Sequence, residues 1–442
     1  MDNDPAHIIE ARSMSARQWL AVGLTVVLNA LDGFDVLSSA FAGPGIKQEW
    51  NLGPDGLGAI LAMELIGMGV GSLLLGGAAD RFGRRPTILA CLALMVAGML
   101  LAAAAASASP TMLSVWRVVT GLGIGGMLAA INAVAFEFSS QRQRSFSMAM
   151  MVIGYPLGAF FGGLVASVLL QHYGWRSVFL LGGGFTLVCI PLVIAFIPES
   201  PTWLARARPA RALERINRTL GSFGHPAIDA LPDHPVAERR GSVMELFSPA
   251  NRRATLTLSL GYATHAFTFY YILKMAPAII SDPQFAGQSF TRAQGASVLA
   301  FANLGGAIGG GVFGWFMYRF GVKRATMSAL FLSVLLVIGF GVGQTTLTGW
   351  TLAVATVGLF TNAAIVGFYA MFALAYPTQL KATGTGFALA IGRGGAALSP
   401  ILAGVLFAEK LSLPVVSAIM AIGSLLALIL ITTLPADKRR GA

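Results

Sequence analysis

Six ionisable side chains lie inside long apolar stretches of the sequence, where charged residues are rare. They are Asp32, Asp35, Glu64, Arg117, Lys274 and Arg393. A charge at the centre of a lipid bilayer costs about 2.5–3.5 kcal/mol on insertion scales, so a charge kept there is a candidate for function. Carboxylates in such surroundings can store and release protons, and cations can bind an anionic ligand.

The two aspartates are three residues apart, so their side chains share one face of a helix. Each carboxylate then disfavours ionisation of the other unless a cation lies nearby, and Arg117 is the natural candidate. We hypothesise that Asp35 pairs with Arg117 in one state and takes up a proton in another, while Asp32 shares or tunes that proton. A static structural ion pair is the alternative. For Glu64, a second proton site and a hydrogen-bonded packing role are equally open.

The ionisable groups inside the apolar stretches of the second half are cationic or neutral, as binding of an anion requires. Arg393 can hold a carboxylate through two parallel N–H donors, and we predict that it anchors a substrate. His265 could donate to the same acid or to a ring hydroxyl, or it is a satisfied core histidine. Lys274 is expected to extend to the outer membrane interface more readily than to bind a ligand. Three aromatic residues could line the same cavity, namely Tyr155, Tyr270 and Tyr369. Packing between helices or contact with lipid is the alternative for each of them.

The composition shows which kind of elements must position these groups. Of the 442 residues, 55% are hydrophobic and 11% are charged, and the mean hydropathy is +0.72. A soluble globular protein carries about 25% charged residues, and apolar runs of about 20 residues are long enough to cross a bilayer. We therefore predict an all-α integral membrane protein with twelve transmembrane helices. The predicted spans are 19–43, 57–79, 86–107, 111–136, 146–170, 176–197, 254–280, 293–317, 325–343, 348–373, 383–408 and 411–434.

The spans form two sets of six. Residues 198–253 between the sets are polar, so we predict an N-terminal six-helix bundle at 1–197, a cytoplasmic linker at 198–253, and a C-terminal bundle with a short tail at 254–442. The triplet Arg-Phe-Gly at 81–83 recurs at 319–321, which an internal duplication explains. Two pseudo-symmetric bundles with a substrate site between them are typical of a transporter.

Lysine and arginine are concentrated in alternate loops. The predicted outer loops hold Lys47, Arg176, Arg292 and Lys410, and most of the other cations fall in loops of the opposite parity. Cytoplasmic loops carry the excess of such residues, so we expect both termini in the cytoplasm and the protein in the inner membrane. The same distribution accounts for the net charge of +11 without nucleic acid as a partner.

A basic loop with glycines follows the second predicted span. Its residues Gly76, Asp80, Arg81, Gly83, Arg84 and Arg85 resemble the signature G-x-x-x-D-[RK]-x-G-R-[RK] of the major facilitator superfamily. The resemblance implies the major facilitator fold over the full chain, with Asp80 in a cytoplasmic latch that opens and closes during transport. The second copy of the loop has Tyr318 in the place of Asp80. A simple orientation anchor is the alternative interpretation of the loop.

Within that superfamily, the segment LDGFD at 31–35 resembles the D-G-x-D motif of the aromatic acid:proton symporter family. The segments PESPTWL at 198–204 and YPTQLKATGTG at 376–386 fit the same family. The resemblance implies a secondary transporter that imports an aromatic carboxylate, such as a hydroxybenzoate, together with protons. A facilitator for another organic acid, a sugar or a polyol, working as importer or exporter, is the alternative.

An integral membrane enzyme or sensor is a third class, and the residue inventory speaks against it. The five histidines form no H-E-x-x-H pattern, and the sequence contains no phosphate-binding glycine loop. Cys91 and Cys189 both lie in apolar runs, which disfavours a disulfide or a thiolate metal site. We expect no catalytic residue, metal or cofactor. The expected partners are a small aromatic carboxylate, protons and membrane lipid, with a monomer as the default.

Overall fold

The computed structural model describes residues 4–105, 109–232, 242–286, 290–377 and 380–434. All regular secondary structure in these residues is helical. Twelve of the described helices have 20 residues or more. A helix of about 20 residues measures about 30 Å, the thickness of the hydrocarbon core of a bilayer. The predicted all-α fold with twelve long helices is therefore confirmed.

The long helices match the predicted spans closely. The first six are α2 (Ala16–Glu49), α3 (Pro54–Leu75), α5 (Arg84–Ala105), α6 (Pro110–Glu137), α7 (Arg144–His172) and α8 (Arg176–Phe196). The other six are α11 (Arg252–Ser281), α13 (Arg292–Phe320), α14 (Val322–Gly341), α15 (Leu347–Ala375), α16 (Lys381–Ala408) and α17 (Leu413–Thr432). The larger differences are that α2 continues to Glu49, and that α3 ends at Leu75 and is followed by the short helix α4 (Ala78–Phe82).

Eleven of the twelve long helices in the described part of the chain are apolar enough to be candidate membrane spans. The exception is α11, which carries His265, Thr268 and Lys274 in its interior. All three side chains are 0% exposed. The polar residues of α11 are therefore covered by other helices, and this allows a long helix of modest hydropathy to belong to the bundle.

Glycines allow several of these helices to approach one another closely. A Cβ atom at Gly158 of α7 would lie 1.9 Å from the carbonyl oxygen of Ala30 in α2. Likewise, a Cβ atom at Gly358 of α15 would lie 2.2 Å from the carbonyl oxygen of Ala302 in α13. Any side chain at these two positions would force the helices apart, so the glycine-rich composition is used for backbone packing.

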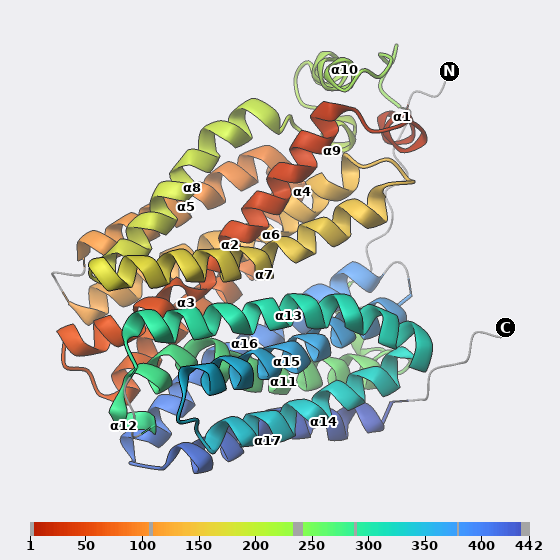
Figure 1. Cartoon of the computed structure of the whole chain (residues 1–442). Coiled ribbons are helices and arrows are strands. Elements are labelled where there is room, and N and C mark those ends of the chain that lie inside the picture. Colours follow the sequence, from red (N-terminus) through yellow and green to blue (C-terminus); the bar gives the residue numbers. More distant parts are fainter. Residues whose placement is uncertain (1–3, 106–108, 233–241, 287–289, 378–379, 435–442) are drawn as a thin grey trace. The chain divides into compact units, whose positions relative to one another are not determined.

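The segment between the two sets of helices contains three short helices among its described residues. They are α9 (Pro201–Ala207), α10 (Ala212–Ser222) and the 3₁₀ helix η1 (Val243–Phe247). Helices α9 and α10 pack against each other, whereas η1 packs against α11 and α16. The N-terminal helix α1 (Pro5–Ala11) joins α9 and α10 through a small apolar cluster in which Ile9, Leu204, Ile216 and Leu220 are fully buried. Figure 1 shows α1, α9 and α10 side by side. The sequence pattern did not predict that the N-terminal segment would cover the linker.

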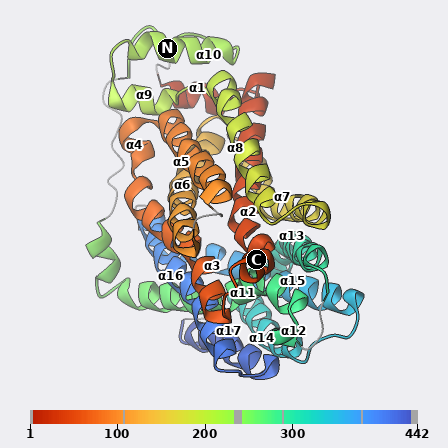
Figure 2. The ribbon, with the colours of Figure 1, turned by 90° about the vertical axis from the view of Figure 1, so that its left-hand side faces the viewer.

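Contacts between the helices divide the chain into two compact units. Unit 1 consists of Met1–Val36, Gly67–Gly158 and Phe179–Ala237, and unit 2 consists of Leu37–Ile66, Ala159–Val178 and Glu238–Ala442. Within unit 2, helices α11 and α13 to α17 form one bundle, as Figure 1 and Figure 2 show. The units do not follow the expected linker, since parts of α2, α3 and α7 belong to unit 2. The domain boundaries at 197/198 and 253/254 therefore stay a prediction.

The two cysteines lie within unit 1, on α5 and α8. Cys91 and Cys189 are both free thiols and are each 1% exposed. Among the described residues, no group of three or more His, Cys, Asp or Glu side chains is arranged to hold a metal ion.

Candidate functional site

The two aspartates predicted to exchange protons lie buried in unit 1. Asp32 is 3% exposed, and both Asp35 and Arg117 are 0% exposed. Arg117 comes from α6, and its Nη2 donates a hydrogen bond to the backbone oxygen of Asp35 at 3.2 Å. The guanidinium also lies over the ring of Phe179, 4.9 Å from the ring centroid. The structure therefore brings the Arg117 guanidinium to the backbone of Asp35, and the pairing of Arg117 with the Asp35 carboxylate stays a prediction.

Helix α8 leaves room for the Asp35 carboxylate by placing a glycine next to it. A Cβ atom at Gly182 would lie 2.8 Å from Asp35 Oδ1 and 2.2 Å from Met99 Cε. The absence of a side chain at Gly182 thus lets α8 pack directly against the carboxylate. We did not predict a role for this residue, and its sequence signal is the run of three glycines at 182–184.

Glu64 and Lys274 form an ion pair inside unit 2. The Lys274 Nζ lies 3.0 Å from Glu64 Oε2, and neither side chain has any exposed area. The hydroxyl of Ser39 accepts a hydrogen bond from Lys274 at 3.1 Å and donates one to Glu64 at 2.9 Å. The three residues come from α11, α3 and α2, so this contact holds three helices together.

The expectation that Lys274 extends to the outer membrane interface is wrong. Its side chain is completely buried, because the neighbouring residues of α11 pack against protein and Glu64 supplies the opposite charge. The ammonium is bound to a protein carboxylate rather than placed for a ligand, so a substrate contact from Lys274 is not supported by this geometry. For Glu64, the arrangement agrees with the alternative of a hydrogen-bonded packing residue.

A second ion pair lies at the end of α2 in the same unit. Lys47 binds Asp282 and donates a hydrogen bond to Gln284 at 2.6 Å. Its ammonium also lies 4.6 Å from the centroid of the Phe285 ring. The residues after α11 are thus tied to the predicted outer end of α2 by charge as well as by packing.

Arg393 lies half-buried on α16 and contacts an aromatic residue of α11. Its Nη1 donates a hydrogen bond to the hydroxyl of Tyr270 at 3.2 Å. This contact orients the guanidinium, a group whose planar set of five N–H donors fits a carboxylate. The two residues predicted to bind a substrate acid are therefore neighbours in the structure.

A cluster of aromatic rings surrounds Tyr262 of α11. The ring centroids of Phe368, Tyr369 and Phe372 of α15 lie 5.8, 5.9 and 5.6 Å from that of Tyr262. Tyr262 also packs on Gly392, where a Cβ atom would lie 2.2 Å from the tyrosine ring. Tyr262 was not predicted, although it precedes Tyr270 by about two helical turns, a spacing that places both near one face of α11.

His265 and Tyr155 differ from the other predicted substrate residues. The two ring nitrogens of His265 lie 2.9 Å from the hydroxyl of Ser424 and 2.9 Å from the backbone oxygen of Thr361. The geometry thus matches the alternative of a satisfied core histidine. Tyr155 belongs to unit 1, where its backbone packs against Gly33, whereas Arg393 belongs to unit 2.

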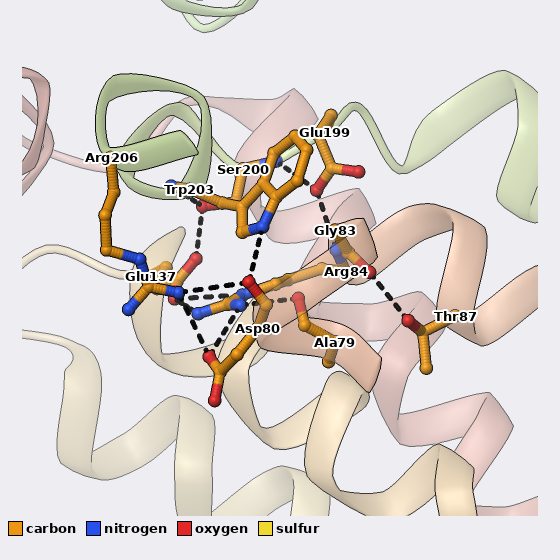
Figure 3. Close-up of polar contacts among 10 residues, drawn as sticks. All are labelled: Ala79, Asp80, Gly83, Arg84, Thr87, Glu137, Glu199, Ser200, Trp203 and Arg206. Atoms are coloured by element: carbon orange, nitrogen blue, oxygen red, sulfur yellow. Dashed lines mark hydrogen bonds and ion pairs between the residues drawn. The ribbon is translucent and has the colours of Figure 1, made fainter. Parts of the chain in front are cut away.

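The predicted gate loop forms an ion-pair network in unit 1, which Figure 3 shows. Arg84 donates from Nη1 to Asp80 at 2.9 Å and from Nη2 to Glu137 at 2.7 Å. Arg206 of α9 also reaches Asp80, at 3.3 Å. Asp80, the residue that the family resemblance implies for the latch, therefore joins the loop to the segment that follows α8.

The residues that follow α8 add further hydrogen bonds to this network. Glu199 accepts hydrogen bonds from the backbone N–H groups of Arg84 at 2.8 Å and of Ser200 at 2.9 Å. Trp203 donates from its indole N–H to the carbonyl oxygen of Asp80 at 2.9 Å. Burial raises the pKa of Glu199, although the backbone donors act in the opposite direction.

The other predicted gate residues have distinct positions. Gly83 has a φ of +107°, and a Cβ atom there would lie 2.3 Å from Glu199 Oε2, so only glycine fits this turn. Arg85 donates to a backbone oxygen of α8 at 2.6 Å. Arg81 is exposed, and Gly76 lies in the turn between α3 and α4.

Two acidic residues of the network were not predicted. Glu199 lies within the PESPTWL segment, which resembles a family motif but does not indicate which residues Glu199 contacts. Glu137 is the last residue of α6, one position beyond the predicted span, and nothing in the sequence distinguished it from an ordinary helix end.

Replacing Glu137 with Gln is expected to weaken the network, because Arg84 is largely buried and would lose a charged acceptor. We expect a loss of about 1–3 kcal/mol of stability, measured as a lower melting temperature in detergent. Glu214→Gln is the matched control, since Glu214 pairs with Arg218 on an exposed surface where such pairs contribute about 0–1 kcal/mol. Equal melting temperatures of the two variants would contradict a structural role for the network.

Comparisons with known proteins are in line with this architecture. A family model described as the Major Facilitator Superfamily matches residues 25–355. The chain is 30% identical to a gallate transporter of Pseudomonas putida, over 94% of this chain and 91% of that protein. It is 31% identical to the 4-hydroxybenzoate transporter PcaK of Pseudomonas aeruginosa, over 89% and 87% of the two chains. The xylose transporter XylE from E. coli, solved in a partially occluded inward open conformation, superimposes with a TM-score of 0.72 at 16% identity, over 97% of this chain and 100% of that chain, a likeness that concerns the fold alone.

Proposed function

This chain belongs to the Major Facilitator Superfamily, and from that premise we propose that it imports an aromatic carboxylate of the hydroxybenzoate type together with protons, by alternating access. The family match confirms the predicted superfamily and its fold. It also makes the chain a multi-pass membrane transporter rather than an enzyme. The aromatic substrate, the coupling to protons, the direction of transport and the cytoplasmic position of both termini are parts of the proposal.

The surroundings of Arg393 carry the proposal of an aromatic acid. A guanidinium suits a carboxylate, and here it is hydrogen-bonded to Tyr270, while the ring of Tyr262 packs on the preceding residue, Gly392. Aromatic side chains would add little to the binding of a small aliphatic acid, whereas they can pack against the ring of an aromatic substrate. The names of the relatives, which refer to gallate and to 4-hydroxybenzoate, support the same substrate class.

The aspartate pair supports coupling to protons. Protonation of Asp35 would remove a charge whose burial is costly, and would thereby change the balance between two conformations of the transporter. Asp32 shares or tunes this proton, and the contact of Arg117 with the backbone of Asp35 supports a role for the guanidinium as the neighbouring cation.

The ion pairs supply contacts that a transport cycle must break and reform. We propose that the Asp80 network acts as the cytoplasmic latch, in keeping with the family resemblance. The Glu64–Lys274 pair must separate whenever α3 and α11 part, and a proton on Glu64 would weaken it. Glu64 therefore stays part of the proposed proton coupling. Its protonation would act through the ion pair with Lys274, which the sequence pattern did not predict.

Uptake of labelled 4-hydroxybenzoate into membrane vesicles, with and without an imposed pH gradient, tests the proposed function. We expect accumulation only when the proton gradient is directed inward. Competition by unlabelled sugars, polyols and aliphatic acids separates the alternative substrates. Failure of benzoates to compete, with strong competition by a sugar or polyol, would favour the other facilitator.

Replacing Arg393 with Lys is expected to lower the uptake efficiency for 4-hydroxybenzoate by at least about tenfold. The charge stays, but a lysine cannot present two parallel donors to a carboxylate, a loss of about 1.5–3 kcal/mol. Arg218→Lys is the control, because Arg218 is exposed on α10. Initial uptake rates at several substrate concentrations give the comparison, and equal efficiencies would remove Arg393 from the proposed substrate site.

A further inference from the structure

Resting on the proposed function, we propose that the hydroxyls of Tyr262 and Tyr369 form a subsite for a phenolic hydroxyl of the substrate. The transporter would then prefer aromatic acids that carry a ring hydroxyl over the same acids without it. Tyr262 lies on α11 and Tyr369 on α15, two helices that pack against each other within unit 2.

The distance between the two hydroxyls leaves hydrogen-bonding capacity for a ligand. Their oxygens are 3.4 Å apart, whereas hydroxyl–hydroxyl bonds usually measure about 2.7–2.8 Å. The hydrogen bond between the two tyrosine hydroxyls is therefore weak. Since a phenol can both donate and accept, a third hydroxyl near this pair can accept from one tyrosine and donate to the other.

The two tyrosines differ in exposure in a way that suits recognition. Tyr262 is 9% exposed, and its ring is fixed by edge contacts with Phe368 and Phe372. Tyr369 is 42% exposed and is therefore accessible. A buried hydroxyl among apolar rings has little access to water, so a ligand that leaves it unpaired binds less well than one that satisfies it.

The subsite lies next to the proposed carboxylate anchor. Tyr262 packs on Gly392, the residue immediately before Arg393. Tyr270, which accepts the hydrogen bond from Arg393, stands eight residues after Tyr262 on the same helix, about 12 Å farther along its axis. A benzene ring between these positions would direct its carboxylate toward Arg393 and Tyr270, and its hydroxyl toward Tyr262 and Tyr369.

Tyrosine-to-phenylalanine variants test the subsite with little change in shape. We would measure initial uptake of labelled benzoate and 4-hydroxybenzoate in vesicles, normalised to the amount of transporter, for the unmodified protein, Tyr262→Phe and Tyr369→Phe. The unmodified protein is expected to favour 4-hydroxybenzoate, and each variant to reduce that preference about tenfold. Benzoate uptake is expected to stay within about twofold, because benzoate has no hydroxyl to lose a partner.

Tyr271→Phe provides the matched control. Tyr271 is also a buried tyrosine of α11, but its hydroxyl bonds to Ser417 at 2.9 Å, so its loss should leave the preference unchanged. Uptake of both acids with the same preference in all four proteins would overturn the subsite and leave the proposed function standing. If the unmodified protein takes up no aromatic acid, both the proposed function and the subsite are wrong. Competition binding to purified protein gives the same ratio for a variant that reaches the membrane poorly.

Discussion

Lys274→Gln is expected to destabilise the transporter by about 3–5 kcal/mol and to stop uptake almost completely. The substitution removes the ammonium that lies 3.0 Å from Glu64, at a place where neither side chain is exposed. Breaking a buried ion pair from one side leaves the remaining charge in a medium that solvates it poorly, and this gives the large expected cost. Thermal unfolding in detergent and uptake in vesicles measure the two effects.

Double substitutions distinguish the ion pair from simple packing. Glu64→Gln combined with Lys274→Gln removes both charges and should recover most of the lost stability, because no buried charge is left. Lys381→Gln serves as the control at an exposed lysine. A double variant as unstable as the sum of the two single variants would show that the charges do not stabilise each other.

Asp35→Asn is expected to abolish accumulation of the substrate against its gradient, while downhill exchange continues. Asparagine keeps the size of the side chain but cannot exchange a proton at this position, so substrate movement would no longer depend on the pH gradient. Accumulation driven by an imposed pH gradient, and exchange at equal pH on both sides, would be measured on the same vesicles. The expected loss is at least about a hundredfold in the ratio of internal to external substrate that a two-unit pH gradient can support.

Asp55→Asn is the matched control for this experiment, because Asp55 is an exposed residue in the first turn of α3. It should leave accumulation and exchange unchanged. Accumulation by Asp35→Asn that still follows the pH gradient would exclude Asp35 as the coupling residue. Asp32→Asn would then be the next variant to measure.

The helices could be predicted from the sequence because the bilayer fixes their length. Every apolar run of about 20 residues corresponds to a long helix, and even the modestly apolar α11 begins and ends within two residues of its predicted bounds. The proximity of Arg117 to Asp35 could be predicted as well, since two neighbouring carboxylates in an apolar segment require a cation.

The partners of the other charges could not be predicted in the same way. The depth of Lys274 along its own helix suggested the outer interface, but depth says nothing about which helices lie beside it, and Glu64 lies there. Glu137 and Glu199 were missed for the same reason, because their role depends on Arg84 from a distant part of the sequence. Periodicity and hydropathy describe one helix at a time, whereas ion pairs between helices depend on the tertiary packing.

The burial of both cysteines has a practical consequence for following conformational changes. Cys91 and Cys189 are each 1% exposed, so polar maleimides should react with them slowly. Pairs of cysteines introduced at exposed positions could then carry fluorescent or spin labels in the natural background, with both original thiols kept in place. Distances between such labels would report the movements of the protein during turnover without a cysteine-free variant.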